Sequence, residues 1–237
     1  MSVEKDSNKY DEIMNDNWII NSNMMAYDKV GDLRMYGLAD GYNWITNFTK
    51  IINDKLIIGD TDIDGIYYTS YLYDVDLMGR IKNQIVAPKG YGFHHDGVSD
   101  GENYYFLGND ENSKSTKYKE SLIFKYDKNF NYKKTYDIGS LFTGEEEVLM
   151  NSTKDDIHLN SIDYLQAENQ LVLSSRSTSD IYSYDLDTNK IEWIVGNQTK
   201  ETNEEFKEKY LTIKNLNELE YTSGQHSAFI AKTASVS

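Results

Sequence analysis

Apolar and polar positions alternate along most of this chain in short runs of the length expected for β-strands. Residues 158–195 show this most clearly, with polar turns between four runs near His158–Tyr164, Gln170–Ser174, Ile181–Asp185 and Ile191–Val195. A period of two is typical of strands, and closely spaced runs predict an antiparallel sheet. The region from about His94 to Asp137 has the same pattern. We therefore expect consecutive sheets of four antiparallel strands.

A Tyr-Asp or Val-Asp pair followed by a tight turn recurs along the chain, each time between two strand-like runs. The aspartates that open these turns are Asp28, Asp76, Asp127 and Asp185. A repeat of about 50 residues is typical of β-propellers, in which four-stranded sheets, the blades, pack around a central channel. The sequence thus predicts an all-β propeller. Four hairpins are fewer than a closed ring usually needs, so we expect an incomplete ring of about four to five blades and a chain that is a fragment.

One stretch, residues 200–211, interrupts the pattern. Thr202 and Glu205 have the spacing of a capping box, and Phe206 and Tyr210 lie about one helical turn apart. We expect a helical insertion here within a single propeller domain that covers residues 1–237. A buttress over the next blade and a plain solvated helix both fit this pattern.

The composition agrees with this fold class and argues against several kinds of partner and chemistry. The chain has 20 tyrosines and one proline, a balance that favours strands and turns. A net charge of -15 repels phosphate backbones and anionic lipids, so we expect neither nucleic acid nor membrane partners. The absence of cysteine excludes disulfides, thiolate metal sites and a cysteine nucleophile. Met1–Tyr10 is polar and no apolar run reaches the length of a membrane helix, which predicts a cytoplasmic protein if Met1 is the natural start.

The candidate chemistry centres on the stretch Asp155–Arg176. In an extended strand His158 and Asn160 share one face while Leu159 points to the other. The returning apolar run ends near Arg176, which is one of only three arginines in the chain. A histidine, an amide and an arginine at one end of a hairpin predict an anion site.

Two further polar segments open predicted blades: Phe93–Asp96, with the sequence FHHD, and Gly224–His226, with the sequence GQH. The first strands of the blades line one channel in a propeller, so His95, His158 and His226 are expected to converge although they are far apart in sequence. Any one of these histidines taken alone is more often a packed or surface residue than a functional one.

Other motifs fail on inspection. Residues 139–146, GSLFTGEE, have the glycines of a phosphate loop without its Lys-Ser/Thr pair, and GYGFHH lacks the third glycine of a dinucleotide site. Residues 60–65, DTDIDG, copy the opening of a calcium loop, but Tyr71 stands where the bidentate glutamate belongs. We interpret these residues and the acidic run 144–148 as solvated loops. The motifs HExxH and GxSxG are absent from the sequence.

The segments HLNSIDY, LVLSSRSTSDIYSYD and KIEWIVG, with HHD and GQH around them in that order, resemble the bacterial arylsulfate sulfotransferases. The resemblance extends from about Asn21 to Ile230. It implies a six-bladed propeller that moves a sulfuryl group from an aryl sulfate ester to a phenolic acceptor without a nucleotide sulfate donor. It also implies ping-pong kinetics through a sulfohistidine intermediate.

By this resemblance His226 is the nucleophile that becomes sulfated, and His95, His158, Asn160 and Arg176 hold the sulfuryl oxygens. His94 is a further candidate for substrate binding, and either His95 or His158 protonates the leaving phenolate. No cofactor and no metal are implied. The partners would be a small-molecule donor and acceptor, and a homodimer is compatible with a full-length protein. Family members usually also carry an export signal, a separate N-terminal β domain and further blades, which we do not recognise in these residues.

Two other functions are consistent with the sequence. A tyrosine-rich propeller can display loops to a protein or glycan without catalysis. A calcium-dependent, lactonase-like propeller hydrolase would need acidic and amide ligands in its channel, whereas the basic residues found here favour an anion. Whether His95, His158, Arg176 and His226 meet in one pocket separates these alternatives.

Overall fold

The computed structural model describes residues 19–20, 25–28, 30–36, 48–59, 69–76, 79–110, 120–142, 157–200, 204–212 and 223–230. Within these residues the strands form three antiparallel sheets of four strands and one of three, and each sheet takes its strands in sequence order. The three-stranded sheet contains β1 (Ile19–Ile20), β2 (Met25–Tyr27) and β3 (Leu33–Tyr36).

The four-stranded sheets follow one another along the chain. The first is built from β4 (Thr49–Ile52), β5 (Lys55–Gly59), β6 (Tyr71–Val75) and β7 (Ile81–Val86). The second is built from β8 (Tyr91–Ser99), β9 (Asn103–Asp110), β10 (Leu122–Asp127) and β11 (Tyr132–Asp137). The third is built from β12 (Leu159–Leu165), β13 (Gln170–Ser175), β14 (Ile181–Asp185) and β15 (Lys190–Val195).

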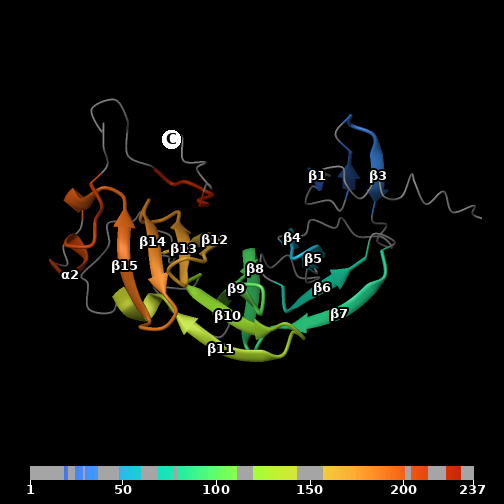
Figure 1. The fold of residues 1–237 in the computed structure, drawn as a ribbon, viewed down its shortest axis with the longest axis horizontal. Coiled ribbons are helices and arrows are strands. Elements are labelled where there is room, and N and C mark those ends of the chain that lie inside the picture. Colours follow the sequence, from blue (N-terminus) through green and yellow to red (C-terminus); the bar gives the residue numbers. More distant parts are fainter. Residues whose placement is uncertain are drawn as a thin grey trace, which may run out of the picture.

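These sheets are arranged as blades of a β-propeller. Figure 1 shows them side by side in an arc, with β4, β8 and β12 toward the inside and β7, β11 and β15 at the outer rim. The predicted all-β class, the four-stranded blades and their radial order are confirmed. The strand bounds also lie within a few residues of the predicted runs.

The alternation of side chains along each strand explains why the blades stack face to face. In β9, Tyr104 and Phe106 enter the apolar core shared with the β4–β7 sheet, whereas Tyr105 and Leu107 enter the core shared with the β12–β15 sheet. All four are at most 3% exposed. Because β9 is covered on both faces of its sheet, four consecutive residues of this strand, 104–107, are buried aromatic or aliphatic side chains. Each such side chain contributes about 1.5–3 kcal/mol by burial.

The predicted aspartate turns connect the last two strands of each sheet. The Oδ1 atom of Asp127 accepts hydrogen bonds from the N–H groups of Asn129 and Asn131, both at 2.9 Å. Asp28 and Asp76 hold equivalent turns, and Asp185 holds a related one. An aspartate side chain that bonds to its own turn in this way imitates a backbone turn, which explains the repeat.

The described helical segments are short: η1 (Gly139–Phe142), η2 (Gln198–Lys200) and α2 (Glu204–Lys207). The α2 helix lies inside the stretch where we expected a helical insertion, and its Phe206 ring packs on Phe142 with 5.0 Å between centroids. Among the described residues no helix is long and apolar enough to cross a membrane. Thr202, the calcium-like segment 60–65, the acidic run 144–148 and residues 1–10 and 231–237 lie outside the described residues.

Candidate functional site

Two of the predicted histidines lie where the inner strands depart from regular geometry. His95 has a φ of 50° and His158 a φ of 51°, both in the left-handed region. The pairing of β8 with β9 shifts between Phe93 and Gly97, and that of β12 with β13 shifts between Leu159 and Ser161. Bulges of this kind re-aim side chains, and left-handed conformations in residues other than glycine are concentrated at functional sites.

The four histidines of the chain form one cluster around His95. The ring centroid of His95 lies 5.0 Å from that of His94, 5.2 Å from that of His158 and 5.1 Å from that of His226. The Nδ1 atoms of His94 and His95 are 2.8 Å apart, so one donates a hydrogen bond to the other. The expected convergence of His95, His158 and His226 is therefore present in the structure.

A buried glutamate that the sequence analysis missed completes this cluster. Glu120 is separated from the start of β10 by Ser121, and its Oε2 atom lies 2.6 Å from Nδ1 of His158. Its backbone carbonyl accepts a hydrogen bond of 2.9 Å from the N–H of Leu159. The second and third four-stranded sheets therefore meet at Glu120, and its carboxylate fixes the orientation of the His158 ring.

The segment that carries His226 is held on β12 by side chains of that strand. Nδ2 of Asn160 donates to the carbonyl of Gln225 at 2.7 Å. The N–H of Ala228 donates to Oγ of Ser161 at 2.8 Å, and the N–H of Ile230 donates to Oδ2 of Asp163 at 2.7 Å. These bonds run along one strand, so they fix both the position and the register of residues 225–230.

Gln225 anchors the same segment from its other side. Its Nε2 atom donates to the carbonyls of Ser175 and Asp180, each at 3.0 Å. The N–H of Gly224 donates to Oγ of Ser179 at 2.9 Å. In the GQH motif the glutamine is thus a structural clamp, and it places the next residue, His226, against His95.

Asp96, the last residue of the FHHD segment, ties three inner strands together. Its Oδ1 atom accepts from Nζ of Lys50 in β4 and from the N–H of Gly97 in β8. Its Oδ2 atom accepts from the N–H of Ile162 in β12 at 3.1 Å. The carboxylate therefore holds the strands that carry the histidines at a fixed separation.

Two predicted residues take positions that differ from the expectation. His158 and Asn160 do not share one extended strand, because β12 begins at Leu159 and His158 adopts a left-handed conformation. The side chain of Asn160 is directed to Gln225. Arg176 is exposed just beyond the end of β13, and its N–H donates to the carbonyl of His158 at 3.1 Å.

Burial and neighbouring rings lower the pKa of His95 from 6.5 to about 3. Desolvation is the largest cause, and the charges that His94, His158 and His226 carry when protonated act in the same direction, while Glu120 opposes them. His95 is therefore neutral at neutral pH and offers one N–H donor and one nitrogen acceptor. Such a ring accepts or donates hydrogen bonds at the centre of the cluster without adding charge.

Sequence reasoning found the four histidines but not the residues that arrange them. Gln225 and Asp96 lie within the two motifs that were singled out, so their positions carried a signal although their roles did not. Glu120 lies outside every motif and reaches His158 only through the packing of two blades. No local pattern in the sequence marks such a residue.

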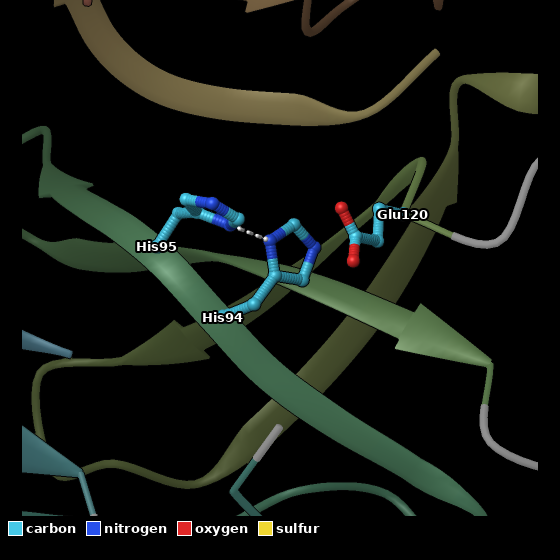
Figure 2. Close-up of side chains that lie close together, drawn as sticks. All are labelled: His94, His95 and Glu120. Carbon is cyan, nitrogen blue, oxygen red and sulfur yellow. Dashed lines mark hydrogen bonds between the residues drawn. The ribbon is translucent and has the colours of Figure 1, made fainter. Parts of the chain in front are cut away.

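One subset of the cluster has the geometry of metal ligands. His94, His95 and Glu120 each offer a ligand atom, and these three atoms lie within 4.8 Å of one another. Figure 2 shows the His94 ring between His95 and the carboxylate of Glu120, which faces His94 from the side opposite His95. His94 and Glu120 are buried, whereas His95 is partly buried.

A family sequence profile described as Arylsulfotransferase (ASST) matches residues 3–236. No curated protein matches the chain. Among solved structures, hydrazine synthase from Kuenenia stuttgartiensis is similar with a TM-score of 0.48 and 12% identity over 72% of this chain and 49% of that chain. A streptogramin B lyase is similar with a TM-score of 0.43 and 12% identity over 72% of this chain and 47% of that chain. The chain thus spans less than half the length of either.

Proposed function

The chain belongs to the arylsulfotransferase family, and on that premise we propose that it transfers a sulfuryl group from an aryl sulfate ester to a phenolic acceptor. The reaction needs no nucleotide sulfate donor and proceeds in two steps through a sulfohistidine. The observation that carries the proposal is the convergence of His94, His158 and His226 on the ring of His95.

His226 is the proposed nucleophile because it is the exposed member of the cluster. A lone pair on its imidazole forms a bond to the sulfur of the donor while the bond from sulfur to the aryl oxygen breaks, and the electron pair leaves with the phenolate. The acceptor phenol then attacks the same sulfur and the nitrogen–sulfur bond breaks. The clamps at Asn160 and Gln225 support this role, because an in-line attack requires a fixed nucleophile.

His158 is the proposed proton donor to the leaving phenolate. Its Nδ1 atom contacts the Glu120 carboxylate at 2.6 Å, which fixes the orientation of the ring beside His95. A carboxylate in contact favours the protonated, proton-donating form of an imidazole. His95, with a pKa of about 3, stays neutral and is the weaker candidate for this step. In the second step His158 takes the proton of the acceptor phenol.

Three further groups are proposed to stabilise charge on the sulfuryl oxygens. His95 presents a neutral N–H at the centre of the cluster. The Asn160 amide, in β12, bonds the Gln225 carbonyl through Nδ2, which carries two N–H donors. Arg176 is bonded through its backbone to the carbonyl of His158, and its exposed guanidinium is a planar fork suited to a tetrahedral oxyanion. Replacing Arg176 is expected to slow transfer about a hundredfold to a thousandfold while the nucleophile remains.

The test is turnover of an aryl sulfate whose phenol is coloured, measured with and without a second phenol as acceptor. The wild-type chain should release the coloured phenol and form the new ester with ping-pong kinetics. His226→Ala should abolish both activities, because no sulfohistidine can form.

Ser227→Ala is the matched control. Ser227 is exposed next to His226, and its Oγ donates a hydrogen bond of 2.6 Å to the carbonyl of His226. This variant should transfer at a near-normal rate. A folded His226→Ala protein with near-normal transfer would overturn the assignment, and a folded wild-type chain without turnover would contradict the proposed function.

A further inference from the structure

We propose that His94, His95 and Glu120 also form a binding site for a divalent transition metal ion of the Zn²⁺ type, and that bound metal and sulfuryl transfer exclude each other. The metal site stands on geometry alone. The exclusion rests on the proposed function, because it concerns the residues that would carry out the transfer.

The three ligand atoms are close enough for one ion after a small inward movement. They lie within 4.8 Å of one another, and the Nδ1 atoms of His94 and His95 are 2.8 Å apart. Ligand atoms on a common tetrahedral Zn²⁺ ion lie about 2.0–2.2 Å from it, hence about 3.3–3.6 Å from each other. Side-chain shifts of up to about an ångström are therefore needed, which side-chain torsions supply without moving the strands.

The chemistry of these residues selects the class of ion. Two imidazoles and one carboxylate form a set of nitrogen and oxygen donors that suits Zn²⁺ and neighbouring transition metals, whereas Ca²⁺ and Mg²⁺ prefer oxygen ligands throughout. His94 is 1% exposed and Glu120 is 6% exposed. The carboxylate supplies a negative charge that partly offsets the charge of the ion within this buried site.

The strands hold these ligands in place before any ion binds. His94 and His95 are consecutive residues of β8, and the left-handed backbone at His95 brings both rings to the same side despite the usual alternation. Glu120 comes from a different part of the same sheet, and its carbonyl is tied to β12. A site fixed by three strands loses little conformational freedom when a metal binds.

Metal binding and transfer compete because they need the same atoms. Glu120 cannot bind an ion through the oxygen that contacts His158 and still hold that ring, and His95 cannot give Nδ1 both to an ion and to His94. Transfer should therefore stop when the site is filled.

The direct test is binding of Zn²⁺ to the full chain, measured by competition with a chromophoric chelator. The wild-type protein should bind one ion per chain, and Glu120→Gln should weaken binding about tenfold or more. Glu102→Gln is the matched control, since the side chain of Glu102 is 77% exposed and contacts Lys128 on the surface. His226→Ala should leave Zn²⁺ affinity unchanged while it abolishes transfer, which separates the two proposals.

A second measurement locates the ion even where a variant fails to fold. Crystals of the wild-type chain grown with Zn²⁺ should show an anomalous scattering peak in contact with His94, His95 and Glu120. A peak elsewhere, the absence of a peak, or equal affinity of wild-type, Glu120→Gln and His94→Gln proteins would overturn the metal site. Undiminished transfer at saturating Zn²⁺ would overturn the exclusion, whereas Zn²⁺ binding by a chain without transfer activity would contradict only the proposed function.

Discussion

Asp76 at the outer rim and Asp96 at the inner strands are both aspartates of a blade, but their partners come from different distances along the chain. Asp76 contacts Arg80, four residues on, and Lys82, which lies in the neighbouring strand β7. Asp96 accepts hydrogen bonds from Lys50, 46 residues earlier, and Ile162, 66 residues later. The rim is therefore encoded locally, whereas the site depends on three blades being assembled.

Backbone strain differs less sharply between the two regions. At the rim the left-handed position of the turn is taken by Gly31 and Gly79 in two turns, at no steric cost, and by Phe130 in a third. At the inner strands the left-handed residues are His95 and His158. Glycine thus fills this position in two of the rim turns, whereas the left-handed residues of the inner strands are both histidines of the cluster, with ring centroids 5.2 Å apart.

The largest effect is expected when the carboxylate that ties the inner strands is removed. Asp96→Ala leaves the N–H groups of Gly97 and Ile162 without their acceptor, which should lower the free energy of unfolding by about 3 kcal/mol. Transfer should fall about a hundredfold, because the histidine-bearing strands separate. Denaturant unfolding and aryl sulfate turnover measure the two effects. Loss of stability with unchanged turnover would mean that Asp96 supports the fold but not the site.

A smaller effect is expected at the clamp on the His226 segment. Asn160→Ala removes the hydrogen bond to the Gln225 carbonyl, so kcat should fall about tenfold to a hundredfold while the chain stays folded. Ser161→Ala, which removes the contact to Ala228, is the neighbouring control and should lower kcat by a smaller factor. A change in KM with kcat intact would instead place Asn160 in substrate binding.

The buried histidine predicts how stability depends on pH. The native pKa of His95 is about 3 and its unfolded value is 6.5, so the unfolded chain takes up a proton that the native protein does not. Stability should therefore fall as the pH is lowered from 6.5 toward 3, by up to about 1.4 kcal/mol per pH unit from this residue.

His95→Asn is the control for this dependence, since asparagine tolerates a left-handed backbone and does not titrate. Urea unfolding between about pH 6.5 and 4.5 measures mainly the contribution of histidines to the free energy of unfolding, because carboxylates ordinarily titrate at lower pH. A slope that is the same in His95→Asn as in the wild-type protein would contradict the burial of this ring.

The smallest effect is expected at the rim. Asp76→Ala removes the turn acceptor for the Arg80 N–H and should cost about 1 kcal/mol of stability without changing turnover. Asp76→Asn keeps an oxygen in that position and should lower the free energy of unfolding by less than half as much as Asp76→Ala does. Thermal unfolding resolves this difference. A loss of transfer in either variant would show that rim and site are coupled, contrary to the comparison above.

The four-stranded blades could be predicted from the sequence because the patterns that indicate them involve residues close together in the chain. An aspartate opens the last hairpin turn of each sheet, and alternating side chains divide between the two faces of each sheet, so both patterns can be seen within a few residues. The histidine cluster was predicted only through the propeller, which brings first strands together. Glu120 could not be predicted, because its contact with His158 arises from the packing of two sheets. Side-chain alternation also did not predict the left-handed conformation of His158, since a bulge changes which face the following residues point to.

The most direct test of the central claim is to find where the sulfuryl group is attached during turnover. The full chain is mixed with an aryl sulfate labelled in its sulfuryl group, quenched before an acceptor is added, digested and mapped by mass spectrometry. We predict one label per chain on His226, its loss in His226→Ala, and its discharge when a phenol is added to the labelled protein. A label on His95 or His158, or steady transfer with no labelled histidine at any time, would contradict the account.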